Sequence, residues 1–258
     1  MNSGTKRHTS ATVPSPTRAD FADTIASGRR LGVPKTRGVT NADWEAHLAR
    51  ETARHQDGEA RLGDAQDADS RQRQLTRLGN AAGGAGLALL MLGRADDSAD
   101  WLHRAADRYR ESFPDAPPGS WGRPIGAMKA LILAGDWAKA EDAARWALEA
   151  GAADADSPIG RYAAALALLV LGRPAEARRH ADAIRTRDDF PSDVGDALAF
   201  LAAEDVAGYE TAVESVLESF ETRDEYLEDL PIADTVLVLQ ALAERRGMAA
   251  ELSSALLP

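Results

Sequence analysis

Three residues with the chemistry of metal ligands are spaced evenly along one segment. His47, Glu51 and His55 are four residues apart, so a helix would place all three on one face. Imidazole nitrogens and carboxylate oxygens are common zinc ligands, and one adjacent pair could begin a site that other residues complete. The two histidines would lie about 12 Å apart along the axis, too far for one ion unless the helix bends. We therefore favour an exposed helix face with hydrogen bonds between successive turns, and we expect no metal site.

A second group of reactive side chains is an acidic cluster near residue 225. It consists of Glu221, Asp224, Glu225, Glu228 and Asp229, with Arg223 as the one base among them. Paired carboxylates can act as general acid and base, but nothing in the flanking sequence indicates a pocket around them. If the segment is helical, like charges four residues apart destabilise it slightly. We expect a solvated acidic face; a binding patch is the alternative, and a catalytic site is the least favoured.

Familiar catalytic and cofactor motifs are absent from the sequence. The glycine-rich run 83–86 has no following lysine and no preceding strand pattern, so it is not a phosphate-binding loop. There is no serine nucleophile elbow and no metalloprotease helix. The absence of cysteine excludes disulfides, thiolate metal sites and the zinc deaminase pattern. We predict that the protein is not an enzyme and needs no cofactor, and an enzyme built into a helical groove is the least favoured alternative.

Charge is distributed unevenly along the 258 residues, which carry a net charge of -11. Residues 188–258 hold 3 Lys+Arg and 17 Asp+Glu, whereas residues 1–40 hold 7 Lys+Arg and 2 Asp+Glu. The acidic C-terminal quarter argues against nucleic acid as a partner. It suits a basic partner or the basic N-terminal arm of the same chain, and it is equally consistent with a role in solubility.

Neither a membrane span nor a secretion signal is expected from the sequence. The longest apolar run, 81–92, is much shorter than the roughly 18 residues that a spanning helix needs. The first residues are polar and basic and lead into no apolar segment, so they do not form a signal peptide. We expect a cytoplasmic protein that does not bind membranes.

The pattern of apolar residues predicts paired helices joined by short turns. Four turns align along the chain: Leu92-Gly93-Arg94, Ala134-Gly135-Asp136, Leu171-Gly172-Arg173 and Ala203-Glu204-Asp205. Rows of mostly small or apolar residues follow these turns at helical spacing: Ser98, Ala140, Ala177 and Tyr209; Leu102, Ala144, Ala181 and Val213; Ala105, Ala147, Ile184 and Val216. We expect helices over 18–31, 42–56, 70–92, 97–112, 122–134, 137–150, 158–171, 174–187, 192–203, 206–221 and 231–246. Self-similarity of this kind indicates stacked helical hairpins.

Two of these turns carry a more specific resemblance. Leu171-Gly172-Arg173-Pro174-Ala175-Glu176-Ala177 and Ala134-Gly135-Asp136-Trp137-Ala138-Lys139-Ala140 resemble the turn of the tetratricopeptide repeat. The starts Pro124-Ile125-Gly126 and Pro158-Ile159-Gly160 lie 34 residues apart, the length of that repeat. The resemblance implies an all-α fold, an irregular α-solenoid of tetratricopeptide-like helical hairpins whose first helices line a concave groove.

The same resemblance places a set of candidate partner-binding residues in that groove. These are Trp121, Arg123, Lys129, Arg161 and Tyr162, at or near the starts of first helices. Arginine and aromatic residues are frequent interface anchors. The alternative is that Trp121 and Tyr162 are packing residues and that the basic side chains are solvated. Trp101, Trp137 and Trp146 fall on second helices, where we expect core positions.

These observations divide the chain into a disordered tail over 1–17, a helical N-terminal segment and linker over 18–69, with the linker at 57–69, and a helical-repeat domain over 70–258. The expected function is a non-enzymatic scaffold that binds a protein or peptide partner. An alternative comes from the stretch 237–258, which resembles all-helical bacterial immunity proteins that neutralise a toxin by direct binding. Its acidic surroundings would suit a basic toxin.

Overall fold

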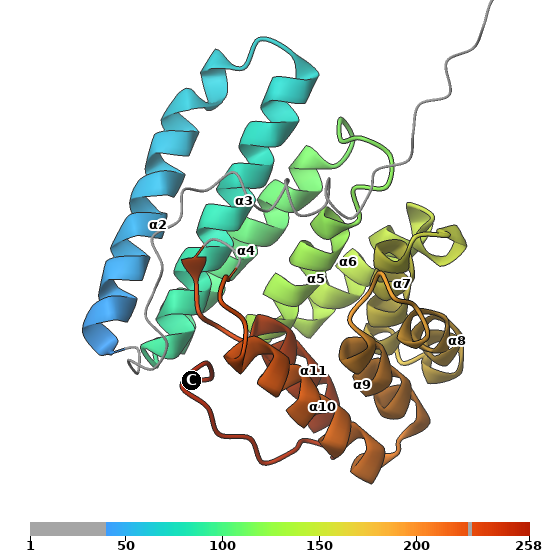
Figure 1. The fold of residues 1–258 in the computed structure, drawn as a ribbon. Coiled ribbons are helices and arrows are strands. Elements are labelled where there is room, and N and C mark those ends of the chain that lie inside the picture. Colours follow the sequence, from blue (N-terminus) through green and yellow to red (C-terminus); the bar gives the residue numbers. More distant parts are fainter. Residues whose placement is uncertain (1–39, 227–228) are drawn as a thin grey trace, which may run out of the picture. The chain divides into compact units, whose positions relative to one another are not determined.

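The computed structural model describes residues 40–226 and 229–258, which all belong to one compact unit, Val33–Pro258. Within this part the chain is all-helical and contains no strand (Figure 1). None of its helices is long and apolar enough to cross a membrane. The tail expected over 1–17 and the helix expected over 18–31 lie outside the described residues.

The helices agree closely with those expected from the sequence. They are α2 (Asn41–Arg61), α3 (Ala68–Met91), α4 (Ala95–Ser112), α5 (Gly122–Leu133), α6 (Trp137–Glu149), α7 (Pro158–Val170), α8 (Pro174–Arg185), α9 (Ser192–Ala203), α10 (Val206–Glu221) and α11 (Asp234–Glu244). Two short 3-10 turns are η1 (Leu62–Asp64) and η2 (Ala152–Asp154). Most of the linker predicted over 57–69 is therefore helical, and that prediction was wrong.

A tertiary contact explains the extra length of α2. A methyl group added at Gly58 would stand 2.8 Å from Leu78 Cδ2, so α2 lies very close to α3 at this point. Gln74 also donates a hydrogen bond to the Gly58 carbonyl at 3.0 Å. These contacts hold a turn of helix whose own sequence is charged and weakly periodic.

The turns between paired helices share one backbone feature. Gly93, Gly135 and Gly172 have φ of 71°, 70° and 67°, and Glu204, at the corresponding place in the fourth turn, has φ of 56°. This left-handed conformation ends the first helix and reverses the chain. Where the turn continues into Asp136 or Asp205, that side chain caps the second helix.

The aligned rows of the sequence form the buried side of the second helices. All twelve positions on α4, α6, α8 and α10 are at most 1% exposed. Helices that are consecutive from α2 to α10 pack against one another along the chain. Alanine dominates these contacts, and its small side chain lets helix backbones approach closely.

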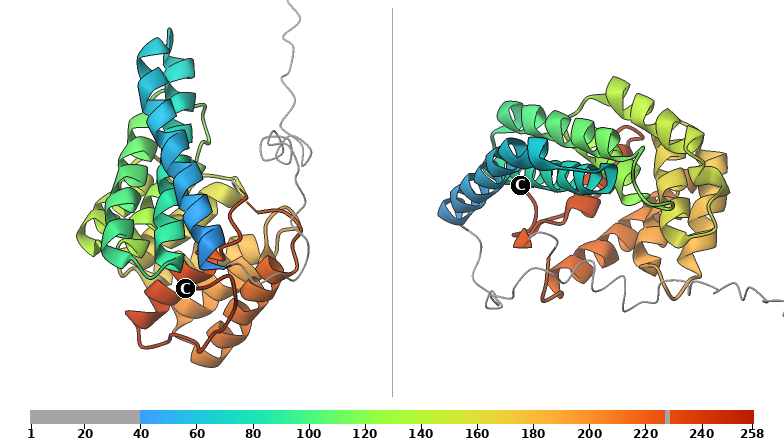
Figure 2. Two further views of the ribbon diagram at one scale, coloured as in Figure 1. Left: turned by 90° about the vertical axis from the view of Figure 1, so that its left-hand side faces the viewer. Right: turned by 90° about the horizontal axis from the view of Figure 1, so that it is seen from above.

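Helix α11 departs from this sequential packing. It contacts α9 and α10, as the next helix in order would, but it also contacts α5 (Figure 2). Its apolar side chains Val236, Val238, Leu239 and Leu242 are at most 1% exposed. After the helix ends, Arg246 donates to the Leu169 carbonyl at the end of α7, at 2.6 Å. The end of the chain is thus part of the packed core and reaches back to α5 and α7.

Candidate partner-binding surface

Lys129, the central basic residue of the expected groove, is paired with the chain itself. Its ammonium lies 2.5 Å from Asp234 Oδ2, at the start of α11, and donates to Thr235 Oγ1 at 3.1 Å. Burial, the largest single effect, lowers the pKa of Lys129, but the charge and hydrogen bond of Asp234 together with the nearby Tyr162 outweigh it, so the pKa is raised. The positive charge of this residue is therefore neutralised by α11.

The two arginines of the expected groove also have internal partners. Arg123 is half-buried at the start of α5; its Nε donates to Ser112 Oγ at 3.0 Å, and its Nη2 donates to Gln72 Oε1. Burial lowers the pKa of its guanidinium. Arg161 lies 3.6 Å from Asp156, and its side chain is 31% exposed. Arg123 thus serves contacts between the ends of α3, α4 and α5.

Trp121 and Tyr162 are packing residues. They are 9% and 7% exposed. Trp121 lies 6.4 Å from the Phe113 ring, and Tyr162 lies 5.6 Å from the Phe190 ring, both measured between centroids. Burial raises the pKa of the Tyr162 hydroxyl. The structure brings Tyr162 near Lys129, but it does not gather the five expected residues around one open pocket.

Two of the three residues with metal-ligand spacing are buried and the third, His47, is half-buried, which corrects the expectation of an exposed helix face. Glu51 is fully buried and accepts hydrogen bonds from Arg50 Nε at 2.9 Å and Arg54 Nη1 at 2.8 Å. His55 is 8% exposed and meets the Trp101 ring edge-on at 5.2 Å. Sequence reasoning failed here because polar side chains on this face pack against α3 and α4. No group of three or more metal-binding side chains occurs among the described residues.

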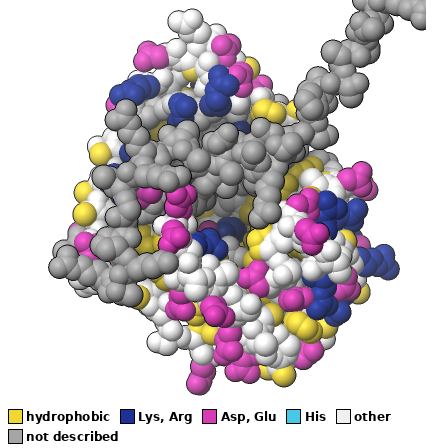
Figure 3. Space-filling view, in the orientation of Figure 1, with side chains coloured by type: hydrophobic (Ala, Val, Ile, Leu, Met, Phe, Trp, Pro, Cys, Tyr) yellow, Lys and Arg dark blue, Asp and Glu magenta, His cyan; other side chains and the backbone are white. Residues whose placement is uncertain are grey.

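Helix α10 ends at Glu221, so Asp224 and Glu225 of the acidic cluster lie beyond it and are not helical. Glu228 lies outside the described residues, and Glu221 accepts a hydrogen bond from Ser254 Oγ at 2.6 Å. A clearer acidic surface precedes it on α10, which carries no basic residue. Its exposed carboxylates are Glu210, Glu214, Glu218 and Glu221. Acidic side chains also dominate the lower part of the face in Figure 3.

Few apolar side chains in the described ranges are open to solvent. Within residues 40–226 and 229–258, Val206 is the one large apolar residue that is strongly exposed, at 52%. A broad apolar docking face is therefore absent from this part of the chain. A binding surface has to be sought in the smaller hollows between helices, where apolar and charged groups meet.

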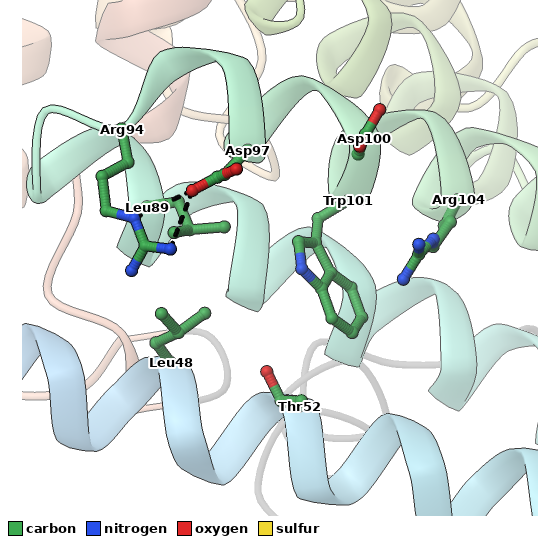
Figure 4. Close-up of a pocket in the computed structure, with 8 residues that line it drawn as sticks. All are labelled: Leu48, Thr52, Leu89, Arg94, Asp97, Asp100, Trp101 and Arg104. Atoms are coloured by element: carbon green, nitrogen blue, oxygen red, sulfur yellow. Dashed lines mark hydrogen bonds and ion pairs between the residues drawn. The ribbon is translucent and has the colours of Figure 1, made fainter.

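One such hollow lies between α2 and α4, above α3, and we call it the α2–α4 pocket (Figure 4). Its volume is about 280 Å³. It is lined by Leu48, Thr52, Leu89, Arg94, Asp97, Asp100, Trp101 and Arg104. Leu48, Leu89 and the Trp101 ring are its apolar part, and the two arginines lie on either side of them in Figure 4.

The two arginines of the α2–α4 pocket differ in their partners. Arg94 donates to Asp97 Oδ2 at 3.0 and 2.7 Å and also lies 3.9 Å from Glu45. Arg104 instead lies over the Trp101 ring, with its Cζ 4.7 Å from the centroid. No carboxylate in the described ranges forms an ion pair with Arg104. The pocket therefore has one neutralised end and one positive end.

Three tryptophans that we expected in the core are only partly buried and lie at its edge. Trp101, Trp137 and Trp146 pack against the core but keep part of their surface open. Each has a guanidinium over its ring, from Arg104, Arg245 and Arg110 respectively. Trp101 and Arg104 are three residues apart in a predicted helix, and this spacing in the sequence indicates that their side chains can meet.

A second hollow lies between α4 and α6 and has a volume of about 110 Å³. Asp136, which caps α6 above it, holds His103 Nε2 at 3.1 Å and Lys139 at 3.2 Å. The hollow is smaller than the α2–α4 pocket, and its His103 and Lys139 side chains already contact Asp136.

Comparison with protein-family models, with curated proteins and with solved structures finds no match to this chain.

Proposed function

We propose that this chain is a non-enzymatic interaction module of the cytoplasm, an irregular α-solenoid of tetratricopeptide-like helical hairpins that binds a protein partner. The fold supports this proposal through its hairpin order, its left-handed turns and the buried alanine rows of the second helices. Stacked hairpins of this kind present long side-chain surfaces that serve recognition.

The observation that carries the proposal is the Trp101–Arg104 pair in the α2–α4 pocket. Tryptophan and arginine are the residues most often found as energetic anchors of protein interfaces. Here both are accessible on one helix, and the arginine has no carboxylate partner in the described ranges. An accessible guanidinium on a partly exposed ring is a strong element for binding.

The face of the first helices is a less favoured binding surface. Its central charge, Lys129, is neutralised by Asp234, and α11 packs against α5. A partner that used this face would have to bind beside α11 or replace its contacts with α5. We therefore place partner binding at the α2–α4 pocket.

A second candidate function is that of an immunity protein that neutralises a bacterial toxin by direct binding. The exposed glutamates of α10 favour it, because a row of carboxylates without bases attracts a basic surface. This function would use α10 and not the α2–α4 pocket, so the two candidates differ in the surface that the partner touches.

Site-specific photo-crosslinking in the native cell tests the proposal. A benzophenone amino acid replaces Thr52 in the pocket, Glu214 on α10 or Ala175 on the exposed side of α8, the last as a control. We expect one discrete protein adduct from Thr52 and none from Ala175, with the partner identified and the complex rebuilt from purified components. An adduct from Glu214 alone would contradict the pocket and support the immunity candidate.

A further inference from the structure

The size of the α2–α4 pocket limits what can enter it. Its volume of about 280 Å³ lies just below the range of ordinary small-molecule sites. One or two side chains of a partner segment fill such a space, whereas a folded surface can only reach it by inserting them. For a module that binds a protein partner, a pocket of this size therefore suits a projecting part of a polypeptide.

The lower part of the pocket requires an apolar group. Leu89 at its base is 2% exposed, and Leu48 and the Trp101 ring face the same space (Figure 4). The edge-on contact of His55 with Trp101, together with Arg104 over the ring, holds the indole in place before any ligand arrives. An apolar side chain of the partner would remove this surface from water without ordering a mobile ring.

The positive end of the pocket requires a carboxylate. The guanidinium of Arg104 has a planar set of donors that matches a carboxylate, and Thr52 lines the same pocket from α2, on the opposite wall. At the opposite end, Arg94 is already held by Asp97. Asp100 is on the rim and points away from Leu48 in Figure 4.

Together these features favour one class of occupant, and this inference rests on the proposed function. We propose that the α2–α4 pocket binds a peptide segment of a partner protein in which an apolar side chain stands next to an aspartate or glutamate. The apolar side chain fits between Leu48, Leu89 and Trp101, and the carboxylate pairs with Arg104. With Arg94 already paired, the pocket offers one unpaired guanidinium, and this and the net charge of -11 disfavour a nucleic acid, which needs many basic contacts.

Selection from random peptides tests this preference without knowledge of the partner. The full chain is immobilised and used to select from phage-displayed 12-residue peptides, in parallel with Arg104→Glu and with Arg179→Glu, a matched reversal on the exposed side of α8. We expect the wild type and Arg179→Glu to enrich peptides with a Leu, Ile, Met or Phe next to Asp or Glu. Arg104→Glu should lose these peptides and enrich Lys or Arg beside the apolar residue.

The affinity of one selected peptide then measures the contact. By fluorescence polarisation, Arg104→Glu should weaken binding by about tenfold or more, as expected for loss of a charged hydrogen-bonded pair, and Arg179→Glu should change nothing. Circular dichroism and the melting temperature establish that both variants remain folded. Enrichment without acidic residues, binding indifferent to Arg104→Glu, or no enrichment at all would overturn the peptide preference.

Two further results separate this inference from the function on which it rests. If Thr52 crosslinks to a partner but the selected peptides lack the acidic residue, the module binds through the pocket and the proposed peptide class is wrong. If sedimentation shows a concentration-dependent dimer that Arg104→Glu abolishes, the occupant is a second copy of this chain and the inference falls. Failure of the Thr52 crosslink alone overturns the proposed function.

Discussion

Glu204 adopts a backbone conformation that the corresponding turns give to glycine. Its φ is 56°, and the equivalent Gly135 has φ of 70° with open space around its α-carbon. A side chain in this region costs about 1–2 kcal/mol, part of which the greater freedom of unfolded glycine offsets. We expect Glu204→Gly to raise the free energy of unfolding by about 1 kcal/mol, measured in urea.

The reverse exchange, Gly135→Glu, is the control and should lower the free energy of unfolding. If Glu204→Gly had no effect while Gly135→Glu was destabilising, contacts of the Glu204 side chain would have to compensate the strain of its backbone.

The glycines of α3 differ in the space around them. A methyl group at Gly86 would stand 2.7 Å from Leu102 Cγ, whereas at Gly83 the nearest atom is 3.8 Å away. We expect Gly86→Ala to destabilise the protein by about 1–3 kcal/mol, because Leu102 is buried and cannot move. Gly83→Ala should be neutral or stabilising by up to about 1 kcal/mol.

Thermal melting of the two glycine variants gives the comparison within one helix. Equal losses would mean that both glycines serve helix bending. The structure instead has one continuous helix with close contacts at selected glycines.

Single residues of the candidate site were harder to predict than the helices that carry them. The burial of Glu51 depends on its two arginine partners and on Gly84, whose added methyl would stand 2.9 Å from Glu51 Cγ. The arginines are visible in the local pattern of α2, but the approach of Gly84 from α3, which buries Glu51, is not. The Trp101–Arg104 pair was visible as a spacing, but its accessibility depends on how α2 lies beside α4.

At the scale of the helices, the close packing of the second helix of each hairpin depends on small residues at its contacts. Ala177 on α8 and Ala140 on α6 are fully buried, and Ala175 on α8 is exposed. We expect Ala177→Trp and Ala140→Trp each to lower stability by about 1–3 kcal/mol or more through overpacking, and Ala175→Trp to leave the melting temperature nearly unchanged. A melting temperature unchanged in all three would contradict the packing register of these helices.

The packing of α2 should respond to pH through His55. Burial lowers the pKa of this imidazole, while Glu59, 3.6 Å away, opposes the shift in part. The unfolded chain therefore takes up a proton more readily, so this contribution is present above about pH 6.5 and is lost as the pH falls. We expect His55→Gln to lose less stability than the wild type between pH 7 and pH 5.

Chemical denaturation at pH 7 and pH 5 gives the change in the free energy of unfolding for each protein. Carboxylates that titrate in this range contribute equally to both proteins, so their effect cancels in the comparison. The control is His103→Gln, on α4. The His103 ring lies beside Asp136 at a partly exposed site. An identical pH dependence in His55→Gln and wild type would show that the buried imidazole is not the group that responds.

The helices were predictable because apolar spacing, turns and caps agree locally. The linker over 57–69 was not, since its helical end depends on contacts of Gly58 with Leu78 and Gln74. The apolar sequence of α11 is typical of a buried helix, but it cannot say against which helices α11 packs. Its contact with α5, more than 100 residues earlier, is a property of the whole packed unit.

For the molecule as a whole, two surfaces compete as the binding site. The first-helix face holds Arg123, Lys129 and Arg161, but each of these has an internal partner. The α2–α4 pocket holds Arg104, whose guanidinium has no carboxylate partner in the described ranges. An arginine that already has a carboxylate partner adds little binding free energy when a partner protein brings a second carboxylate. An accessible arginine without such a partner adds more, and its contribution weakens as the salt concentration rises.

This difference gives a prediction for the partner identified by crosslinking. We expect Arg104→Ala to weaken its affinity by about tenfold at low salt and to reduce the salt dependence of binding. The double variant Arg123→Ala with Arg161→Ala should bind as the wild type does at both salt concentrations, once its fold is verified by circular dichroism. Isothermal titration at low and high salt measures both effects. The opposite pattern, with the double variant weakened and Arg104→Ala unchanged, would place the partner on the first-helix face beside α11.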